Sequence, residues 1–192
     1  MIQLKSIFSD IPKQIRFFLG KALLFFIIWK VIYGLFLYDS KVLDFPLTEH
    51  VANSSVMVLN EFTTMSGFTA EREVGSLIYD ADLIPYGYSH IYHNQKLVLN
   101  VADACNGLEF LVLYLGFIVC MPSNFWRKVK YISIGILVLD GINILRASGL
   151  IYLREYFHAY FDFAHHYLFK VTVYSAAFIM WMVFTRKIQL KE

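Results

Sequence analysis

The sequence predicts an all-α integral membrane protein with about four transmembrane helices, and three observations support this. Of its 192 residues, 58% are hydrophobic and only 17% charged, which is too apolar for an ordinary soluble domain. Four segments approach the roughly 20 apolar residues that a spanning helix needs. Lysines and arginines gather at alternate ends of these segments. We therefore expect a single membrane domain, residues 1–192.

The expected spans are residues 17–38, 107–121, 131–150 and 167–184. The first is longer than the apolar core of a cleaved signal peptide, contains Lys21 and Lys30, and is followed by no small-residue cleavage site. We expect it to be a retained helix. The second is short and needs flanking residues to cross a bilayer.

The distribution of basic residues predicts the orientation. They cluster before the first span, between the second and third, and after the fourth, as Lys5, Lys13, Arg16, Arg127, Lys128, Lys130, Arg186, Lys187 and Lys191. Residues 39–106 are instead predominantly acidic. Because basic segments stay on the cytoplasmic side, both termini should be cytoplasmic and residues 39–106 an extracytoplasmic insertion. The basic residues are thus explained by topology, and we expect no nucleic-acid partner.

The insertion 39–106 is expected to contain an amphipathic helix and a short β-hairpin. Apolar residues of 47–65 fall on one helical face, opposite polar ones. Residues 66–88 resemble a loop because glycines and a proline interrupt them. Residues 88–101 predict two short strands about a turn at His93 and Asn94.

The two cysteines, Cys105 and Cys120, stand at opposite ends of the second expected span. A helical rise of about 1.5 Å per residue separates them by roughly 22 Å, which excludes a disulfide between them. We expect Cys120 to be an apolar filler. Cys105 stands where a polar region gives way to an apolar run.

Polar residues of three segments converge at the depth of Cys105. Asn143 and Arg146 share a face of the third span near its extracytoplasmic end, and the fourth span starts at His165 and His166 on the same side. A thiolate nucleophile, a histidine that moves its proton and an arginine that stabilises an oxyanion are a workable set for acyl transfer. We expect Asn143 either to orient Arg146 or to pair helices.

The strings ACNGLEF, NILR and HYLFK, in this order, resemble the motifs of the exosortase/archaeosortase family. That family consists of multi-spanning membrane cysteine transpeptidases with A-C-S-G-hydrophobic-R, N-x-x-R and H-x-x-x-G motifs. Within it, the chain resembles the short Bacteroidetes-type exosortases, with the exosortase F subgroup as a candidate. The resemblance implies that Cys105 is the nucleophile, Arg146 the anion stabiliser and His166 the general acid/base.

The chain departs from these motifs at Asn106, Glu109 and Lys170, where serine, arginine and glycine are usual. On continuous helices, Glu109 and Lys170 each lie about 6 Å deeper than Cys105 or His166 and on the same face. Opposite charges at equal depth in a bilayer usually pair. We therefore predict a Glu109–Lys170 ion pair that sets the distance between the thiol and the imidazole.

Several alternatives stay open. His165 is a close rival of His166, disfavoured only by the spacing to position 170. A haem or metal protein using His158, His165 and His166 is a rival function, disfavoured because adjacent helical residues point about 100° apart. A non-catalytic four-span scaffold or assembly protein is another, in which Cys105 would be replaceable by serine.

The resemblance implies an enzyme of the bacterial cytoplasmic membrane whose active site faces the extracytoplasmic side. Its substrates would be secreted proteins with a C-terminal sorting signal, cleaved through an acyl-enzyme on Cys105 and then transferred or released. This route needs no metal or organic cofactor. The recognised motif, the acceptor and the need for a membrane partner protein stay open.

Overall fold

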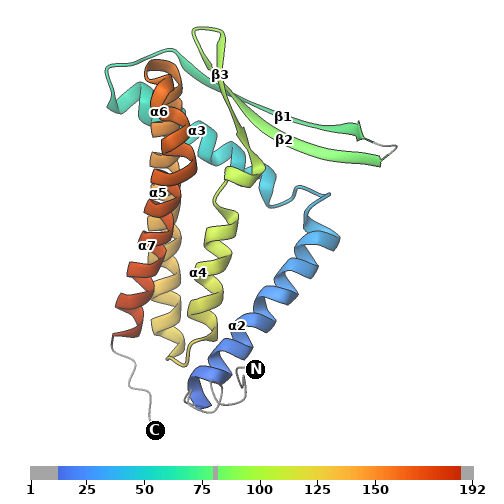
Figure 1. Cartoon of the computed structure of the whole chain (residues 1–192), viewed down its shortest axis with the longest axis vertical. Coiled ribbons are helices and arrows are strands. Elements are labelled where there is room, and N and C mark those ends of the chain that lie inside the picture. The colour runs from blue at the N-terminus through green and yellow to red at the C-terminus, as the bar shows by residue number, and fades with distance from the viewer. Residues whose placement is uncertain (1–12, 80–81, 187–192) are drawn as a thin grey trace, which may run out of the picture.

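A body of long helices is capped at one end by a further helix and a small sheet (Figure 1). The computed structural model describes residues 13–79 and 82–186. The body consists of α2 (Lys13–Ile32), α4 (Leu108–Cys120), α5 (Phe125–Tyr156) and α7 (Phe169–Thr185). The cap consists of α3 (Asp44–Phe62) and the strands β1 (Phe68–Tyr79), β2 (Asp82–His93) and β3 (Lys96–Ala102). The protein is thus mostly helical.

The expected amphipathic helix is present as α3, which begins and ends three residues earlier than the periodicity of 47–65 indicates. Pro46 fits in its first turn, where a missing N–H costs no hydrogen bond. Its apolar face, including Val51 and Leu59, is buried against α5 and the sheet. Burial of that face holds α3 across the end of the helical body.

The sheet is larger than the predicted hairpin. Strands β2 and β3 form the expected hairpin, with Asn94 and Gln95 both at positive φ in a tight two-residue turn. Residues 66–88, expected to be a loop, instead supply β1 and the first half of β2. Pro85 is tolerated because β3 pairs only with residues 88–93 of β2, so the earlier part of β2 has one free edge. The predicted loop was therefore wrong.

Two helical segments are long and apolar enough to cross a membrane in the part of the chain that the structure describes, Phe125–Tyr156 and His158–Thr185. The second joins α6 (His158–Phe163), a π-helical turn η3 (Ala164–Leu168) and α7. The expected span 17–38 corresponds to α2 and the π-helical η1 (Tyr33–Leu37), and α4 is a shorter apolar helix.

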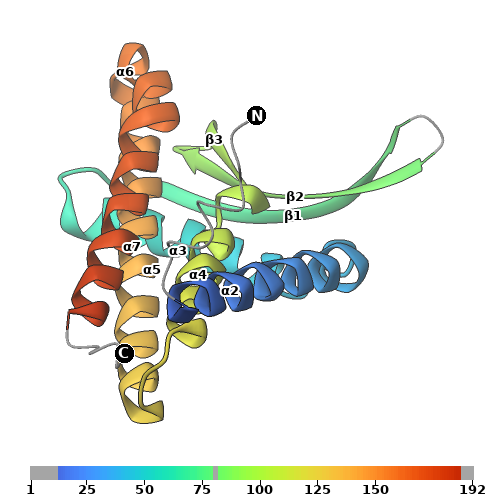
Figure 2. The ribbon, with the colours of Figure 1, turned by 60° about the horizontal axis from the view of Figure 1, so that its bottom comes forward.

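Helices α4, α5 and α7 form the closely packed part of the body, around the buried side chains of Tyr114, Leu139 and Val173. Helix α2 leans on α4, where the ring of Phe25 lies over Gly116, and a Cβ at Gly116 would overlap that ring. In both views α2 stands apart from α5 and α7 (Figures 1 and 2).

Candidate active site

Cys105 lies in a short turn between β3 and α4, which we call the cysteine turn (residues 103–107). A 3₁₀ turn, η2 (Asp103–Cys105), is followed by Asn106 and then by Gly107, whose φ of 87° only glycine adopts freely. A Cβ at Gly107 would also lie 2.9 Å from Nδ2 of Asn143, so the turn sits tightly against α5. Cys105 therefore precedes α4 and does not share its helical register.

Arg146 and Asn143 on α5 hold the cysteine turn from one side. Arg146 donates from Nη2 to Sγ of Cys105 at 3.9 Å and from Nη1 to Oδ1 of Asn143 at 3.4 Å. Asn143 in turn donates from Nδ2 to the carbonyl oxygen of Cys105 at 3.4 Å. Arg146 is only 7% exposed, and its Nε has no hydrogen-bond partner within the described part of the chain. A buried guanidinium thus faces the thiol, and its Nε–H is a hydrogen-bond donor without an acceptor among the described residues.

A cavity of about 220 Å³, the thiol cavity, lies beside Cys105. Asn100, Cys105, Asn143, Arg146 and His165 are its polar lining residues, and the others are apolar, including Leu99, Val101, Ala147, Leu150 and Phe161. An apolar enclosure strengthens electrostatic interactions inside it. Cys105, Asn143 and Arg146, which the sequence singled out, thus meet here, together with one of the two candidate histidines.

The histidine that lines the thiol cavity is His165, whereas His166 is exposed and does not line it. The ring of His165 stacks on Phe161, with centroids 5.8 Å apart, and meets the His166 ring edge-on at 4.9 Å. Adjacent helical residues point about 100° apart, so only one of the two faces the cavity. The spacing argument favoured His166, but it assumed a regular α-helix where the chain forms the π-helical η3.

Glu109 pairs with Lys30 of α2, with Oε1 3.2 Å from Nζ. The predicted Glu109–Lys170 ion pair is therefore wrong. Its premise was a continuous helix from Cys105 to Glu109, and the left-handed Gly107 breaks that helix and turns Glu109 toward α2. Lys170 lies exposed on α7.

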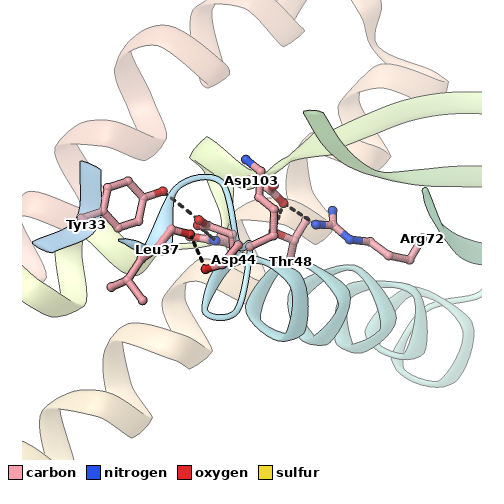
Figure 3. A network of polar contacts seen from close by, with 9 residues as sticks. Tyr33, Leu37, Asp44, Thr48, Arg72 and Asp103 are labelled. Carbon is pink, nitrogen blue, oxygen red and sulfur yellow. Dashed lines mark hydrogen bonds and ion pairs between the residues drawn. The ribbon is translucent and has the colours of Figure 1, made fainter. Parts of the chain in front are cut away.

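An acidic residue of the cysteine turn itself, Asp103, has a largely buried side chain and was not anticipated. Asp103 accepts hydrogen bonds at Oδ1 from Thr48 Oγ1, at 2.7 Å, and from Arg72 Nη2, and its Oδ2 lies 3.4 Å from Lys41 Nζ (Figure 3). Two cations thus share one carboxylate in the turn that carries the thiol. The sequence shows the carboxylate two residues before Cys105, but its partners come from distant α3 and β1.

Asp44 makes a second anchor for the same turn. Its Oδ1 accepts from Nδ2 of Asn106 at 2.8 Å, and its Oδ2 accepts from the hydroxyl of Tyr33 at 2.7 Å (Figure 3). Oδ1 of Asn106 also accepts the N–H of Leu108, the first residue of α4. Asn106 therefore links α3 to the start of α4, and Asp44 adds η1 to this contact through Tyr33.

Within the described residues, no group of three or more His, Cys, Asp or Glu side chains could hold a metal ion. His158, His165 and His166, the ligands of the alternative metal site, therefore form no such cluster.

Comparison with known proteins gives two matches. The family model described as Transmembrane exosortase (Exosortase_EpsH) matches residues 13–184. Archaeosortase A of Haloferax volcanii is 25% identical over 120 residues, which are 61% of this chain and 38% of the archaeal protein. The chain thus covers well under half of that relative. No solved structure matches significantly.

Proposed function

The chain belongs to the transmembrane exosortase family, and on that basis we propose that it is a membrane protein-sorting transpeptidase with Cys105 as its nucleophile. Family membership and the two apolar helical segments indicate a membrane protein. The observation that carries the proposal is the contact between the Arg146 guanidinium and the Cys105 thiol in a cavity that His165 also lines.

In the first step, the thiolate of Cys105 attacks a peptide carbonyl carbon of the substrate. The thiol proton passes to His165, and the developing oxyanion accepts hydrogen bonds from Arg146, whose Nε is unpartnered. Collapse of the tetrahedral intermediate breaks the C–N bond, and the histidine protonates the leaving amine. A thioester to Cys105 and a released C-terminal tail result.

In the second step, an acceptor amine, hydroxyl or water attacks the thioester. His165 removes the acceptor's proton, the C–S bond breaks, and the departing thiolate, stabilised by Arg146, takes that proton back from His165. We assign the acid/base role to His165 because it lines the thiol cavity, and His166 is the alternative. Asn143 positions the guanidinium by its bond to Nη1.

We further propose that α2, α4, α5 and α7 are four spans, with both termini in the cytoplasm of a bacterium. The basic residues Arg127 and Lys128 lie near the start of α5, at the end of the helical body opposite the cysteine turn. The active site then faces the extracytoplasmic side of the inner membrane. Its substrates are secreted proteins with a C-terminal sorting signal.

Capture of the acyl-enzyme tests this function. The wild-type protein in its native membrane is quenched with acid during turnover, and mass spectrometry is used to search for a peptide thioester on Cys105, with Cys105→Ser as the control. We expect a peptide that ends at the new C-terminus of a truncated secreted protein. Absence of an adduct, with normal processing of surface proteins in Cys105→Ser cells, would instead favour a non-catalytic scaffold.

A further inference from the structure

Three cavities follow one another along α2, α4 and α7 and share wall residues. The lowest, of about 370 Å³, lies between α4 and α7. The middle one, of about 230 Å³, shares Leu113 and Tyr174 with the lowest. It also shares Trp29, Lys30 and Glu109 with the uppermost, which measures about 490 Å³. We call this continuous series the lateral groove.

The polarity of the lateral groove changes along its length. The lowest cavity is walled by apolar and aromatic side chains, among them Leu113, Phe117, Ala177 and Phe178. The uppermost cavity has the aromatic residues Trp29, Tyr33, Tyr38 and Tyr88 beside charged Lys41, Asp44 and Asp103. An occupant that fits both ends has an apolar lower part and a polar upper part.

The lateral groove is accessible from the side of the helical body. Tyr174 and Phe178, which line the lowest cavity, remain 52% and 54% exposed. Helix α2 leans on α4 through Phe25 and Gly116 and stands apart from α7 (Figures 1 and 2). A membrane helix could therefore enter between α2 and α7 without first passing through water.

The upper end of the lateral groove lies next to the reactive thiol. The uppermost cavity is lined by Ala104 and Asn106, the residues on either side of Cys105. Ala102 lines both this cavity and the thiol cavity. A chain that leaves the groove at Asn106 thus needs only to cross the cysteine turn to reach Sγ.

The charges of the uppermost cavity distinguish between a peptide and a phospholipid. Two lysines, Lys30 and Lys41, are set against three carboxylates, those of Asp44, Asp103 and Glu109. This balance offers no excess of positive charge for a phosphate headgroup. Backbone amides and uncharged or basic side chains suit it better.

Resting on the function proposed above, we infer that the lateral groove holds the transmembrane helix of the substrate protein. The helix packs against α4 and α7 in the lowest cavity, and the polar segment before it occupies the uppermost cavity. The Lys30–Glu109 ion pair, which lies in the walls of both upper cavities, separates the apolar and polar parts of the bound chain.

Filling the groove tests this inference. Ala177→Trp and Leu113→Trp add bulk to the lowest cavity, far from Cys105, and Leu137→Trp on α5, where Leu137 is 74% exposed, is the matched control. The readout is processing of the surface protein that accumulates uncleaved in Cys105→Ser cells. We expect processing to fall at least about tenfold in the first two variants, from a steric cost of about 1.4 kcal/mol or more, and to be unchanged in the control. Alkylation of Cys105 relative to Cys120 checks that each variant is folded.

Photo-crosslinking identifies the occupant. A photoreactive phenylalanine analogue at position 178 should form an adduct with that same surface protein in Cys105→Ser membranes, and the analogue at position 137 should not. Loss of processing in Cys105→Ser cells, combined with normal processing in the tryptophan variants and only lipid adducts at position 178, would overturn the groove and leave the catalytic proposal standing. Normal processing in Cys105→Ser cells would overturn both.

Discussion

The guanidinium of Arg146 lies against the thiol of Cys105, with Nη2 3.9 Å from Sγ, although the two residues are 41 positions apart. Asn143 closes the arrangement by bonding both to Arg146 and to the carbonyl oxygen of Cys105. The cation is therefore fixed relative to the thiol that we propose as the nucleophile. Such preorganised charge is usually the largest single contribution to transition-state stabilisation.

Replacing Arg146 by lysine should abolish most activity. Lysine keeps the positive charge but loses the planar set of donors that bonds Asn143 and Cys105 simultaneously. Removal of one oxyanion donor commonly costs about 10²–10³ in rate, and we expect processing of surface proteins to fall by at least about 10². The exposed Arg16→Lys on α2 serves as the matched control. Wild-type processing in Arg146→Lys would argue against a role in anion stabilisation.

The adjacent histidines should differ sharply in function. His165→Ala removes the imidazole of the thiol cavity, whereas His166→Ala changes an exposed side chain. A missing general acid/base typically costs about 10²–10⁴ in rate, so we expect His165→Ala to lose at least about 10² and His166→Ala to stay near wild type. Processing assays on the two variants in parallel make the comparison. Normal processing in His165→Ala together with a large loss in His166→Ala would identify His166 as the general acid/base.

The stability of the sheet should decrease as the pH rises above the ordinary pKa of histidine, 6.5. The hydrogen bond to Asn100, aided by Glu73, raises the pKa of His90 above its ordinary value of 6.5. A raised folded-state pKa means that protonation stabilises the fold, so the contribution is complete below about pH 6.5 and is lost as the pH rises through the higher folded-state value. Protease cleavage within β1 and β2 should accelerate accordingly over that range. His90→Gln should remove this pH dependence, and an unchanged profile would refute its assignment to His90.

The parts of the fold that local sequence determines were predicted. Helix α3 follows from the periodicity of its apolar residues, and the β2–β3 turn from the tolerance of Asn94 for positive φ. Strand β1 was not predicted, because the glycines and the proline of residues 66–88 indicate a loop. The hydrogen bonds between β1 and β2 hold this segment extended in spite of them.

The proximity of Cys105, Asn143 and Arg146 could be predicted from the sequence, because the expected topology gives the three residues the same depth. Their chemical roles stay a prediction. The choice between His165 and His166, and the partner of Glu109, depend on a π-helical turn and a left-handed glycine that break helical periodicity. The partners of Asp103 are brought in by tertiary packing from 31 to 62 residues away.

Asp103 should stabilise the cysteine turn strongly. Its carboxylate pairs with Lys41 and Arg72, and all three side chains are at most 11% exposed. Asp103→Asn keeps the shape of the side chain and an acceptor for Thr48 but leaves two buried cations without a counter-charge. Breaking a buried ion pair in this way typically costs about 3–5 kcal/mol. We expect a clearly lower thermal unfolding temperature in detergent and faster alkylation of Cys105 relative to Cys120.

Asp140→Asn provides the matched control, because Asp140 pairs with the half-exposed His50 at 3.0 Å. An exposed pair is worth at most about 1 kcal/mol, so this variant should unfold close to wild type. If Asp103→Asn and Asp140→Asn unfolded at the same temperature, the buried network would contribute little to stability. The rate of Cys105 alkylation distinguishes two roles of the Asp103 network. If the network only stabilises the fold, Asp103→Asn leaves alkylation of Cys105 in the folded protein unchanged. If the network also positions the cysteine turn, Asp103→Asn accelerates it.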